Sequence, residues 1–250
     1  FAGHNVFVRL DPGSGLGHHK LVRTAGANSK FGIVEEDHDA LVALADRHNI
    51  TIRGLHAHVG SGVMHAGAWH RTLETMARWL ERFPDVQVLD LGGGLGVPDK
   101  SGDAALDLVA LDEGLAELKQ QLLRPVQIWL EPGRYLVAEA GVLLARVTQL
   151  KGKGEVQYVG VATGMNSLIR PALYGAYHEI ANLSRLHEPA GQVCNVVGPI
   201  CETGDILGLD RLLPVSEAGD VLLIANAGAY SAAMASNYNL RPPAAELLLD

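Results

Sequence analysis

The first half of the chain alternates short β-branched runs with amphipathic stretches, and this alternation limits the folds available to it. The amphipathic stretches carry apolar residues at helical spacing, as in Leu73, Met76, Trp79 and Leu80. Such a pattern predicts βα units, which assemble into a parallel sheet covered by helices. The expected strands are Asn5–Asp11, Ile50–Val59, Val86–Gly92 and Val126–Glu131, and the expected helices are Asp37–Arg47, Ala66–Phe83 and Leu111–Leu123.

Three of these four strands end in glycine and polar side chains. The groups are His56-x-His58-x-Gly60-Ser61-Gly62, Gly92-Gly93-Gly94 and Glu131-Pro132-Gly133-Arg134. Parallel α/β barrels carry their chemistry at the edge where the carboxyl ends of the strands meet. We therefore expect these three groups to form one functional site.

The second half of the chain changes to β-rich segments with little helix between them. Gly, Pro and Asn turns separate Val142–Leu150, Val156–Ala162, Gln192–Ile200 and Asp220–Ala225. This pattern favours a mostly antiparallel β domain. We expect an α/β domain over residues 1–137 and a β domain over residues 138–250.

Charge and composition exclude several classes of partner. The chain has 28 acidic and 20 basic residues, whereas nucleic acids and anionic membranes require clustered positive charge. Its apolar runs are too short to span a bilayer, which favours a cytoplasmic protein with a small-molecule partner. Cys194 and Cys201 lack the spacing of a disulfide framework or a zinc site, so we expect no metal centre.

Two of the strand-end motifs have both a functional and a structural interpretation. Gly92 to Gly96 can bring backbone N–H groups to a phosphate, with the Ser61 hydroxyl nearby, or can simply allow tight packing. Glu131 can hold a ligand ring nitrogen protonated while Arg134 binds an anion, or the two can form a structural ion pair.

The motifs of the second half are weaker when each is taken alone. Cys201-Glu202-x-x-Asp205 follows Gly198-Pro199, so its thiol belongs to an exposed turn and can donate a proton, although a lone cysteine is usually a small core residue. Arg170-Pro171-x-x-Tyr174 and Gly228-x-Tyr230 offer a guanidinium and two phenols, and each is more often structural.

In chain order these motifs resemble the conserved blocks of the fold-type III pyridoxal-phosphate decarboxylases, and within them the diaminopimelate decarboxylases. The resemblance implies an alanine-racemase-like TIM (β/α)8 barrel followed by a β domain, with pyridoxal 5'-phosphate as cofactor. The matching segments are Ser29–Gly32, Gly54–Gly62, Gly92–Gly96, Glu131–Arg134, Met165–Asn166, Arg170–Tyr174, Cys201–Asp205, Gly228–Tyr230 and Ser236–Asn239.

The resemblance assigns a role to individual residues. It implies that His58 lies against the pyridoxal ring and that Glu131 pairs with the ring nitrogen. Cys201 would deliver the proton that replaces the lost carboxylate, so that Cys201, His58 and Glu131 are the expected catalytic residues. The other cofactor-binding residues would be Ser61, Gly93, Gly94, Pro132, Gly133, Arg134 and Tyr230, and the substrate-binding residues would be Arg134, Arg170, Tyr174, Glu202 and Tyr230.

The resemblance also implies a homodimer in which Cys201 and Glu202 reach the site of the partner subunit. The stretch Asp11–His19 is similar to a bacterial subgroup that includes enzymes fused behind an aspartate kinase, which makes such a fusion a possible context for this chain.

Three features depart from the family pattern. None of the six lysines stands in the family's Tyr-x-x-Lys-Ala-Asn-like motif, which carries the cofactor-linking Schiff-base lysine. Four strands ending at Glu131 are also half of an eight-stranded barrel. We therefore expect the chain to hold only the C-terminal half of the barrel and to be inactive alone. Ala162, moreover, replaces the family's usual Asp.

The activity implied is decarboxylation of meso-2,6-diaminopimelate to L-lysine and carbon dioxide, in lysine biosynthesis. Ornithine or arginine decarboxylation is the nearest alternative, and Glu202 with Arg170 and Tyr174 argues against it, because a lone distal amine needs no anion-binding group. A non-catalytic binding homologue is a second alternative, against which the joint presence of Cys201, Glu131 and His58 speaks.

Overall fold

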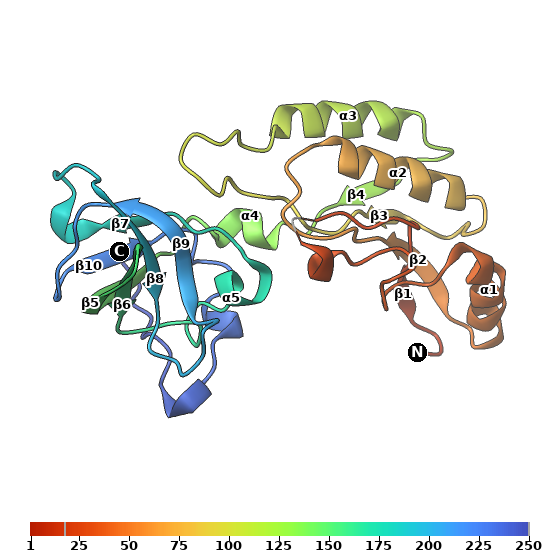
Figure 1. The fold of residues 1–250 in the computed structure, drawn as a ribbon. Coiled ribbons are helices and arrows are strands. Elements are labelled where there is room, and N and C mark those ends of the chain that lie inside the picture. The colour runs from red at the N-terminus through yellow and green to blue at the C-terminus, as the bar shows by residue number, and fades with distance from the viewer. Residues whose placement is uncertain (18, 250) are drawn as a thin grey trace. The chain divides into compact units, whose positions relative to one another are not determined.

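The computed structural model describes residues 1–17 and 19–249, so His18 of the Asp11–His19 stretch lies outside the described residues. The chain divides into two compact units (Figure 1). The parallel unit contains Phe1–Val97 and Ala104–Tyr135, and the antiparallel unit contains Pro98–Asp103 and Leu136–Asp250.

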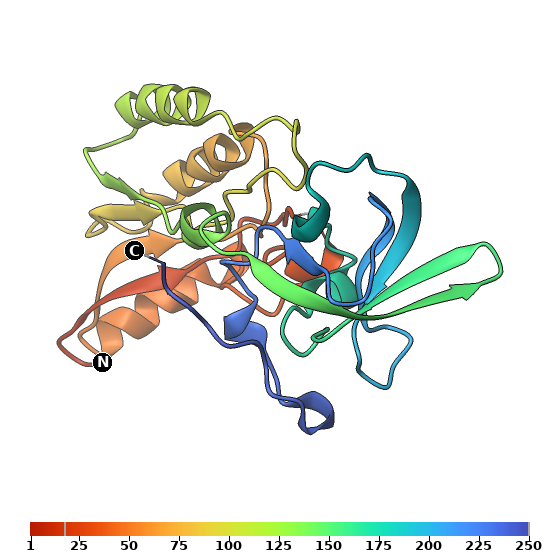
Figure 2. The ribbon, with the colours of Figure 1, turned by 90° about the vertical axis from the view of Figure 1, so that its left-hand side faces the viewer.

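The parallel unit is built on a four-stranded sheet whose strands follow one another in chain order, β1-β2-β3-β4, each parallel to the next. Each connection between neighbouring strands contains one α-helix, which confirms the predicted βα pattern, and α2 and α3 lie side by side (Figures 1 and 2). The elements are β1 (Asn5–Arg9), α1 (His38–Arg47), β2 (Thr51–His56), α2 (Gly67–Trp79), β3 (Val88–Asp90), α3 (Leu108–Gln120), β4 (Gln127–Trp129) and α4 (Gly133–Val137).

One face of this sheet is covered by helices and forms the core. On α2 the side chains of Trp69, Leu73 and Met76 are fully buried, as expected for positions three or four residues apart, and they join Leu55 and Leu89 from the sheet. Each such side chain contributes about 1.5–3 kcal/mol on burial. The helical periodicity of the sequence therefore identified the core-facing side of α2.

The predicted boundaries differ from the observed ones by a few residues. The helix α3 begins at Leu108 and not at Leu111, because the Asp107 carboxylate accepts a hydrogen bond from the Ala110 N–H (2.9 Å) and caps the helix there. The strands are shorter than predicted, since the apolar runs continue into the loops beyond the hydrogen-bonded ladder.

The other face of the parallel sheet is concave. The rings of Phe7 on β1 and Trp129 on β4 lie 5.3 Å apart between centroids, although two strands separate β1 from β4. In a flat sheet these strands would be roughly 14 Å apart, so the sheet must curl toward this face. Gly54 allows the contact, because a Cβ there would lie 2.6 Å from the Phe7 ring.

The antiparallel unit contains a six-stranded sheet in the order β7-β10-β5-β6-β8-β9. Every pair is antiparallel except β6 with β8, which confirms the predicted mostly antiparallel arrangement. The sequence interpretation missed β7, β9 and the short helix α5. The elements are β5 (Leu143–Lys153), β6 (Val156–Val161), α5 (Arg170–Tyr174), β7 (Ile180–Asn182), β8 (Gln192–Val197), β9 (Ile206–Leu213) and β10 (Val221–Ile224).

Short 3₁₀ turns complete the described structure at Lys20–Val22, Glu35–Asp37, Leu183–Arg185, Ala232–Met234 and Tyr238–Leu240. Within residues 1–17 and 19–249, none of the helices combines the length and apolar character needed to cross a lipid bilayer.

Candidate active site

The three polar groups predicted at the strand ends do meet at the carboxyl edge of the parallel sheet. The backbone N–H of Glu131 donates to the Gly92 carbonyl (3.0 Å), and the N–H of Val63 donates to the Gly94 carbonyl (2.9 Å). The N–H of Gly93 donates to Nδ1 of His58 (3.0 Å). The loops that follow β2, β3 and β4 are therefore bound to one another.

The glycines of this edge permit the close contact between loops. A Cβ on Gly93 would lie 2.2 Å from the Glu131 carbonyl oxygen, and one on Gly94 would lie 2.2 Å from that of Gly60. Gly94 also has a φ of 93°, which side chains rarely tolerate. Tight packing is thus sufficient to explain these glycines, and their backbones still border the Ser61 loop.

Ser61 and Arg134 form the part of the edge best suited to an anion. The guanidinium of Arg134, in the first turn of α4, donates to the Ser61 hydroxyl from Nε (3.2 Å) and from a terminal nitrogen (2.9 Å). A guanidinium and a hydroxyl are common hydrogen-bond donors to a phosphate group.

His58 presents a neutral imidazole at this edge. Because Nδ1 accepts the Gly93 N–H, the ring proton is assigned to Nε2. Burial lowers the pKa of His58, and the nearby positive charge of Arg9 lowers it further. A neutral ring of this kind can pack flat against an aromatic ligand.

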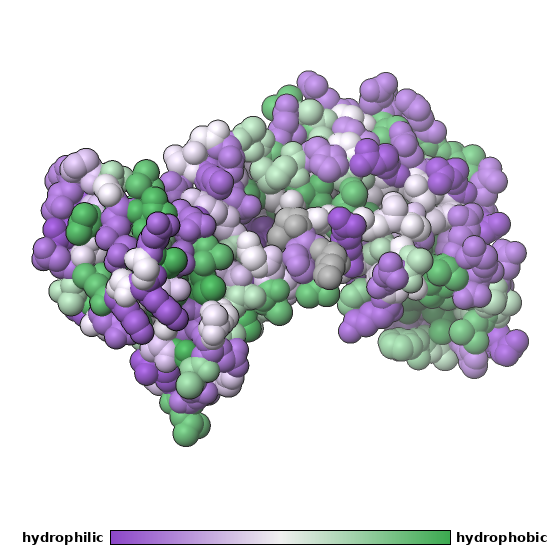
Figure 3. All heavy atoms as spheres, in the orientation of Figure 1, coloured by the Kyte–Doolittle hydropathy of each residue, from purple (hydrophilic) through white to green (hydrophobic). Residues whose placement is uncertain are grey.

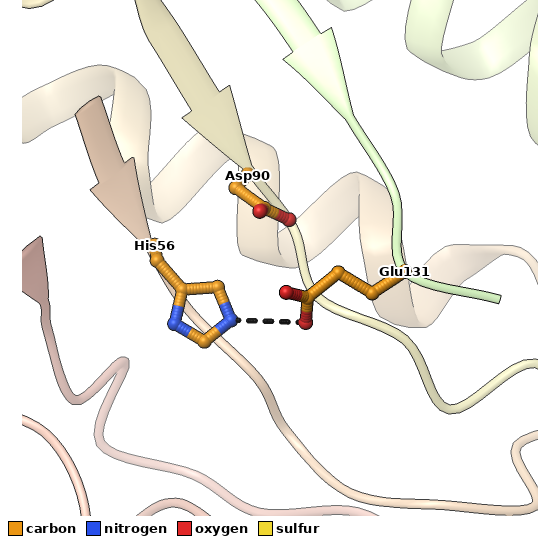
Figure 4. Close-up of side chains that lie close together, drawn as sticks. All are labelled: His56, Asp90 and Glu131. Atoms are coloured by element: carbon orange, nitrogen blue, oxygen red, sulfur yellow. Dashed lines mark ion pairs between the residues drawn. The ribbon is translucent and has the colours of Figure 1, made fainter. Parts of the chain in front are cut away.

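Figure 4 shows that Glu131 lies beside His56 and Asp90, which come from the neighbouring strand ends. The His56 Nε2 and Glu131 Oε2 atoms are 3.3 Å apart, and one ligand atom from each of the three residues lies within 4.8 Å of the others. Asp90 Oδ1 also accepts the Gly92 N–H (3.0 Å). An imidazole and two carboxylates can hold a ligand proton, and the same donor types are found around divalent metals.

The sequence interpretation assigned no role to Arg9 or Asp90, and it placed His56 in a predicted polar group without giving it a role of its own. The guanidinium of Arg9, on β1, donates to the carbonyls of Thr24 (3.1 Å) and His58 (3.3 Å), and burial lowers its pKa. An arginine at the end of an apolar strand is a signal that could have identified Arg9, and a histidine at the last position of β2, two residues before His58, could have identified His56.

In the antiparallel unit, α5 carries both Arg170 and Tyr174. Arg170 is only 5% exposed, and a terminal nitrogen lies 2.9 Å from Nε2 of His178. Nδ1 of His178 lies 2.7 Å from the Ala225 carbonyl, so this nitrogen carries the proton and Nε2 accepts from Arg170. The guanidinium is thus oriented by a histidine that the sequence interpretation missed.

The two cysteines lie in opposite environments. Cys201 is exposed on the turn after β8, whereas Cys194 within β8 is buried, and burial raises the pKa of the Cys194 thiol. Beside Cys201, the Glu202 carboxylate accepts a hydrogen bond from the Tyr238 hydroxyl, and this bond raises the pKa of Tyr238. Cys201 therefore has the accessibility that a proton donor needs.

Tyr230 lies on the loop after β10 with an unusual backbone conformation. Its φ is 62°, in a region uncommon for residues other than glycine. The preceding Gly228 is tightly enclosed, since a Cβ there would lie 1.8 Å from the Val137 carbonyl oxygen.

The predicted site residues form two groups. The parallel unit holds His58, Ser61, Gly93, Gly94, Glu131, Pro132, Gly133 and Arg134, and the antiparallel unit holds Arg170, Tyr174, Cys201, Glu202 and Tyr230.

Diaminopimelate decarboxylases are among the curated proteins with similar sequences. The chain is 40% identical to that of Escherichia coli K12 over an alignment of 264 positions, which covers 99% of the chain and 63% of the relative. It is 38% identical to that of Streptomyces coelicolor, over 99% of the chain and 60% of the relative. The chain therefore spans about three fifths of the length of these relatives.

Solved structures give the same result. The crystal structure of Helicobacter pylori diaminopimelate decarboxylase complexed with L-lysine matches with a TM-score of 0.84 and 30% identity, over 96% of the chain and 60% of that structure. The model of the pyridoxal-dependent decarboxylase family, pyridoxal binding domain, matches residues 1–138. Since this match covers more than half of the chain and includes the whole carboxyl edge described above, the chain belongs to the pyridoxal-dependent decarboxylases.

Proposed function

We propose that the chain is part of a diaminopimelate decarboxylase, which converts meso-2,6-diaminopimelate to L-lysine and carbon dioxide. The observation that carries this proposal is the convergence of His58, Ser61, Glu131 and Arg134 at one edge of the parallel sheet. The curated relatives named above bear this activity in their names.

The residues at this edge fit pyridoxal 5'-phosphate. The phosphate needs hydrogen-bond donors and positive charge, which Arg134 and Ser61 supply next to the backbones of Gly93 and Gly94. The aromatic ring needs a flat, uncharged neighbour, which His58 supplies. The ring nitrogen needs an acidic partner, and Glu131 lies on the same edge.

When bound, the cofactor supplies an electron sink for the bonding pair that remains after carbon dioxide leaves. In our proposal Glu131 holds the proton on the ring nitrogen and His58 packs against the ring. Ser61 and Arg134 bind the phosphate. The remaining contacts come from Gly93, Gly94, Pro132, Gly133 and Tyr230.

The residues of the antiparallel unit would bind the substrate and supply the proton. Arg170, Tyr174 and Tyr230, with Arg134, would bind the distal carboxylate, and Glu202 the distal ammonium group. Cys201 would protonate the carbon that has lost its carboxylate. We further propose that Cys201 and Glu202 act in the site of a partner subunit of a homodimer.

We also propose that residues 1–137 form the C-terminal half of a TIM barrel and residues 138–250 the β domain. Four parallel strands in chain order and a strongly curled sheet support the barrel. The chain alone is expected to be inactive, because none of its lysines stands in the family's lysine motif. A cytoplasmic location and a fused aspartate kinase stay predictions.

The cofactor site can be tested on the chain itself. Equilibrium dialysis should show pyridoxal 5'-phosphate binding that Ser61→Ala and Arg134→Met each weaken about tenfold, the effect of losing one charge-assisted hydrogen bond. Arg53→Met is the matched control, because Arg53 on β2 pairs with Asp85 and takes no part in the proposed site. Equal binding in all four proteins would contradict the proposed phosphate site.

The reaction is tested on the protein as its gene encodes it. Carbon dioxide release should be fastest from meso-diaminopimelate and should fall about a hundredfold or more in Cys201→Ala, as expected when a proton donor is removed. Faster release from ornithine or arginine would favour the alternative decarboxylases. Release from none of the three would favour the non-catalytic homologue.

A further inference from the structure

Asp205 is a buried carboxylate at the end of the turn that carries Cys201 and Glu202, and the proposed function leaves it without a role. It is 2% exposed. Its Oδ1 accepts the backbone N–H of Met165 (2.6 Å), and its Oδ2 accepts that of Ile200 (2.6 Å). One carboxylate thus joins the residue before Cys201 to a segment that follows β6.

The backbone of Asp205 closes the same turn. Its carbonyl accepts the Gly198 N–H (3.0 Å), and its own N–H donates to the Glu202 carbonyl (3.1 Å). The segment from Gly198 to Asp205 is therefore a closed loop with the carboxylate inside it. Hydrogen bonds to an ionised acceptor are about twice as strong as neutral ones, so this loop is held firmly.

Two glycines leave room for the Asp205 carboxylate. A Cβ on Gly164 or on Gly198 would lie 2.3 Å from an Asp205 carboxylate oxygen. Neither glycine has a positive φ. At Gly164 the three atoms nearest to a Cβ all belong to the Asp205 side chain, whereas at Gly198 the Gly164 Cα would also lie close, at 2.4 Å. Two chain segments, Gly164–Met165 and Gly198–Ile200, therefore pack around this one side chain.

We propose that Asp205 is the positioning residue of the Cys201–Glu202 turn. Its carboxylate accepts hydrogen bonds from two backbone N–H groups. These bonds hold the turn that carries the thiol and the Glu202 carboxylate against the segment that follows β6. The value of this placement for the reaction rests on the proposed function of Cys201. The placement itself does not, and it can be measured without any turnover.

The two cysteines of this chain make a direct test possible in the protein as its gene encodes it, with any cysteine outside these residues replaced by serine. A nitroxide reagent should label exposed Cys201 and leave Cys194, which is 2% exposed, unlabelled. In the unaltered chain the electron paramagnetic resonance spectrum should show a restricted label. Asp205→Asn replaces one acceptor oxygen with an amide N–H donor that faces a backbone N–H, so the label should become mobile. In the same variant the Met165 and Ile200 amides should exchange with deuterium at least tenfold faster.

A structural control separates positioning from general destabilisation. Leu222→Ala removes a fully buried side chain on β10, and its spectrum is recorded at the same interval below its own Tm. The label should stay restricted there. An unchanged spectrum in Asp205→Asn, or equal mobility in Leu222→Ala, would overturn the proposal.

A second variant covers the case in which Asp205→Asn does not fold. Gly164→Ala keeps the carboxylate but places a Cβ 2.3 Å from it, so it should also mobilise the label, and a restricted label in it would refute the positioning role. If the spectra change as expected while Cys201→Ala keeps full activity, Asp205 positions the turn but the proposed role of Cys201 is wrong.

Discussion

The two units organise their candidate residues by different means. In the parallel unit the residues stand at strand ends, and backbone contacts between glycine loops bring them together, as at Gly93 and Gly94. In the antiparallel unit they stand on α5 and on separate loops, and buried side chains hold them in place, as His178 orients Arg170. Parallel topology collects residues at one edge by itself, whereas antiparallel topology needs added polar contacts to do so.

The largest expected loss of stability comes from breaking the backbone contacts between the loops of the parallel unit. Gly94→Ala should lower the free energy of unfolding by about 3 kcal/mol, from backbone strain at positive φ together with overpacking against the Gly60 carbonyl. Gly13→Ala is the control, because Gly13 has a φ of 80° and nothing within 4 Å of a Cβ, and should cost only about 1 kcal/mol. Urea unfolding measures both, and equal losses would refute the role of the loop contact.

The next effect addresses a side-chain network in the antiparallel unit. Asp220 accepts hydrogen bonds from Arg185 Nε (2.7 Å), Asn182 (2.9 Å) and the Glu217 N–H (2.9 Å). Although burial by itself raises the pKa of Asp220, these bonds hold it below its ordinary value. Asp220→Asn should therefore lose about 1–3 kcal/mol at neutral pH.

The sign of the pH dependence follows from the lowered pKa of Asp220. The stabilisation is present above the ordinary carboxyl pKa of about 4 and is lost as pH falls through the lower folded value. Thermal unfolding of the original chain and of Asp220→Asn should thus converge in acid. Asp210→Asn changes an exposed residue on β9 and should leave the Tm unchanged. A difference in Tm between the original chain and Asp220→Asn that stays constant at all pH values would contradict the network.

A smaller effect concerns His58 in the parallel unit. Its pKa is lowered by burial and by Arg9, so the unfolded chain takes up a proton near pH 6.5 before the folded chain does. The titration of His58 therefore lowers the stability of the folded chain as the pH falls below about 6.5. Between pH 7.5 and 5.5 the Tm should fall more in the original chain than in His58→Gln, and parallel curves would show that His58 is not buried as described.

The smallest effect concerns the exposed pair in the antiparallel unit. The Tyr238 hydroxyl donates to Glu202, and this bond raises the pKa of Tyr238. In Glu202→Gln the pKa of Tyr238 should move down toward its ordinary value of about 10. Tyrosinate absorbance, taken as a difference from Tyr238→Phe, measures the shift, with Glu155→Gln as the control that should leave it unchanged.

Local sequence signals were sufficient for much of the parallel unit. Helical periodicity located α2, and β-branched runs located the four strands within a few residues, because burial on one face imposes a short repeat. The polar groups after β2, β3 and β4 were also recognisable, since the carboxyl ends of parallel strands must share an edge. A similar reading of the second half found a mostly antiparallel sheet but missed β9, whose Ile206–Leu213 run contains charged residues and lacks regular alternation.

The remaining features depend on contacts between distant residues and leave no local pattern. The curl that brings Phe7 to Trp129 arises from the whole sheet. The position of Asp205 between two segments could not be read from its own neighbours, because Met165 lies forty residues away in the sequence. The sequence by itself determined most elements of the parallel unit and where polar groups stand along them. Only the tertiary structure decided which of those groups meet, because burial and hydrogen bonding depend on the completed packing of both units.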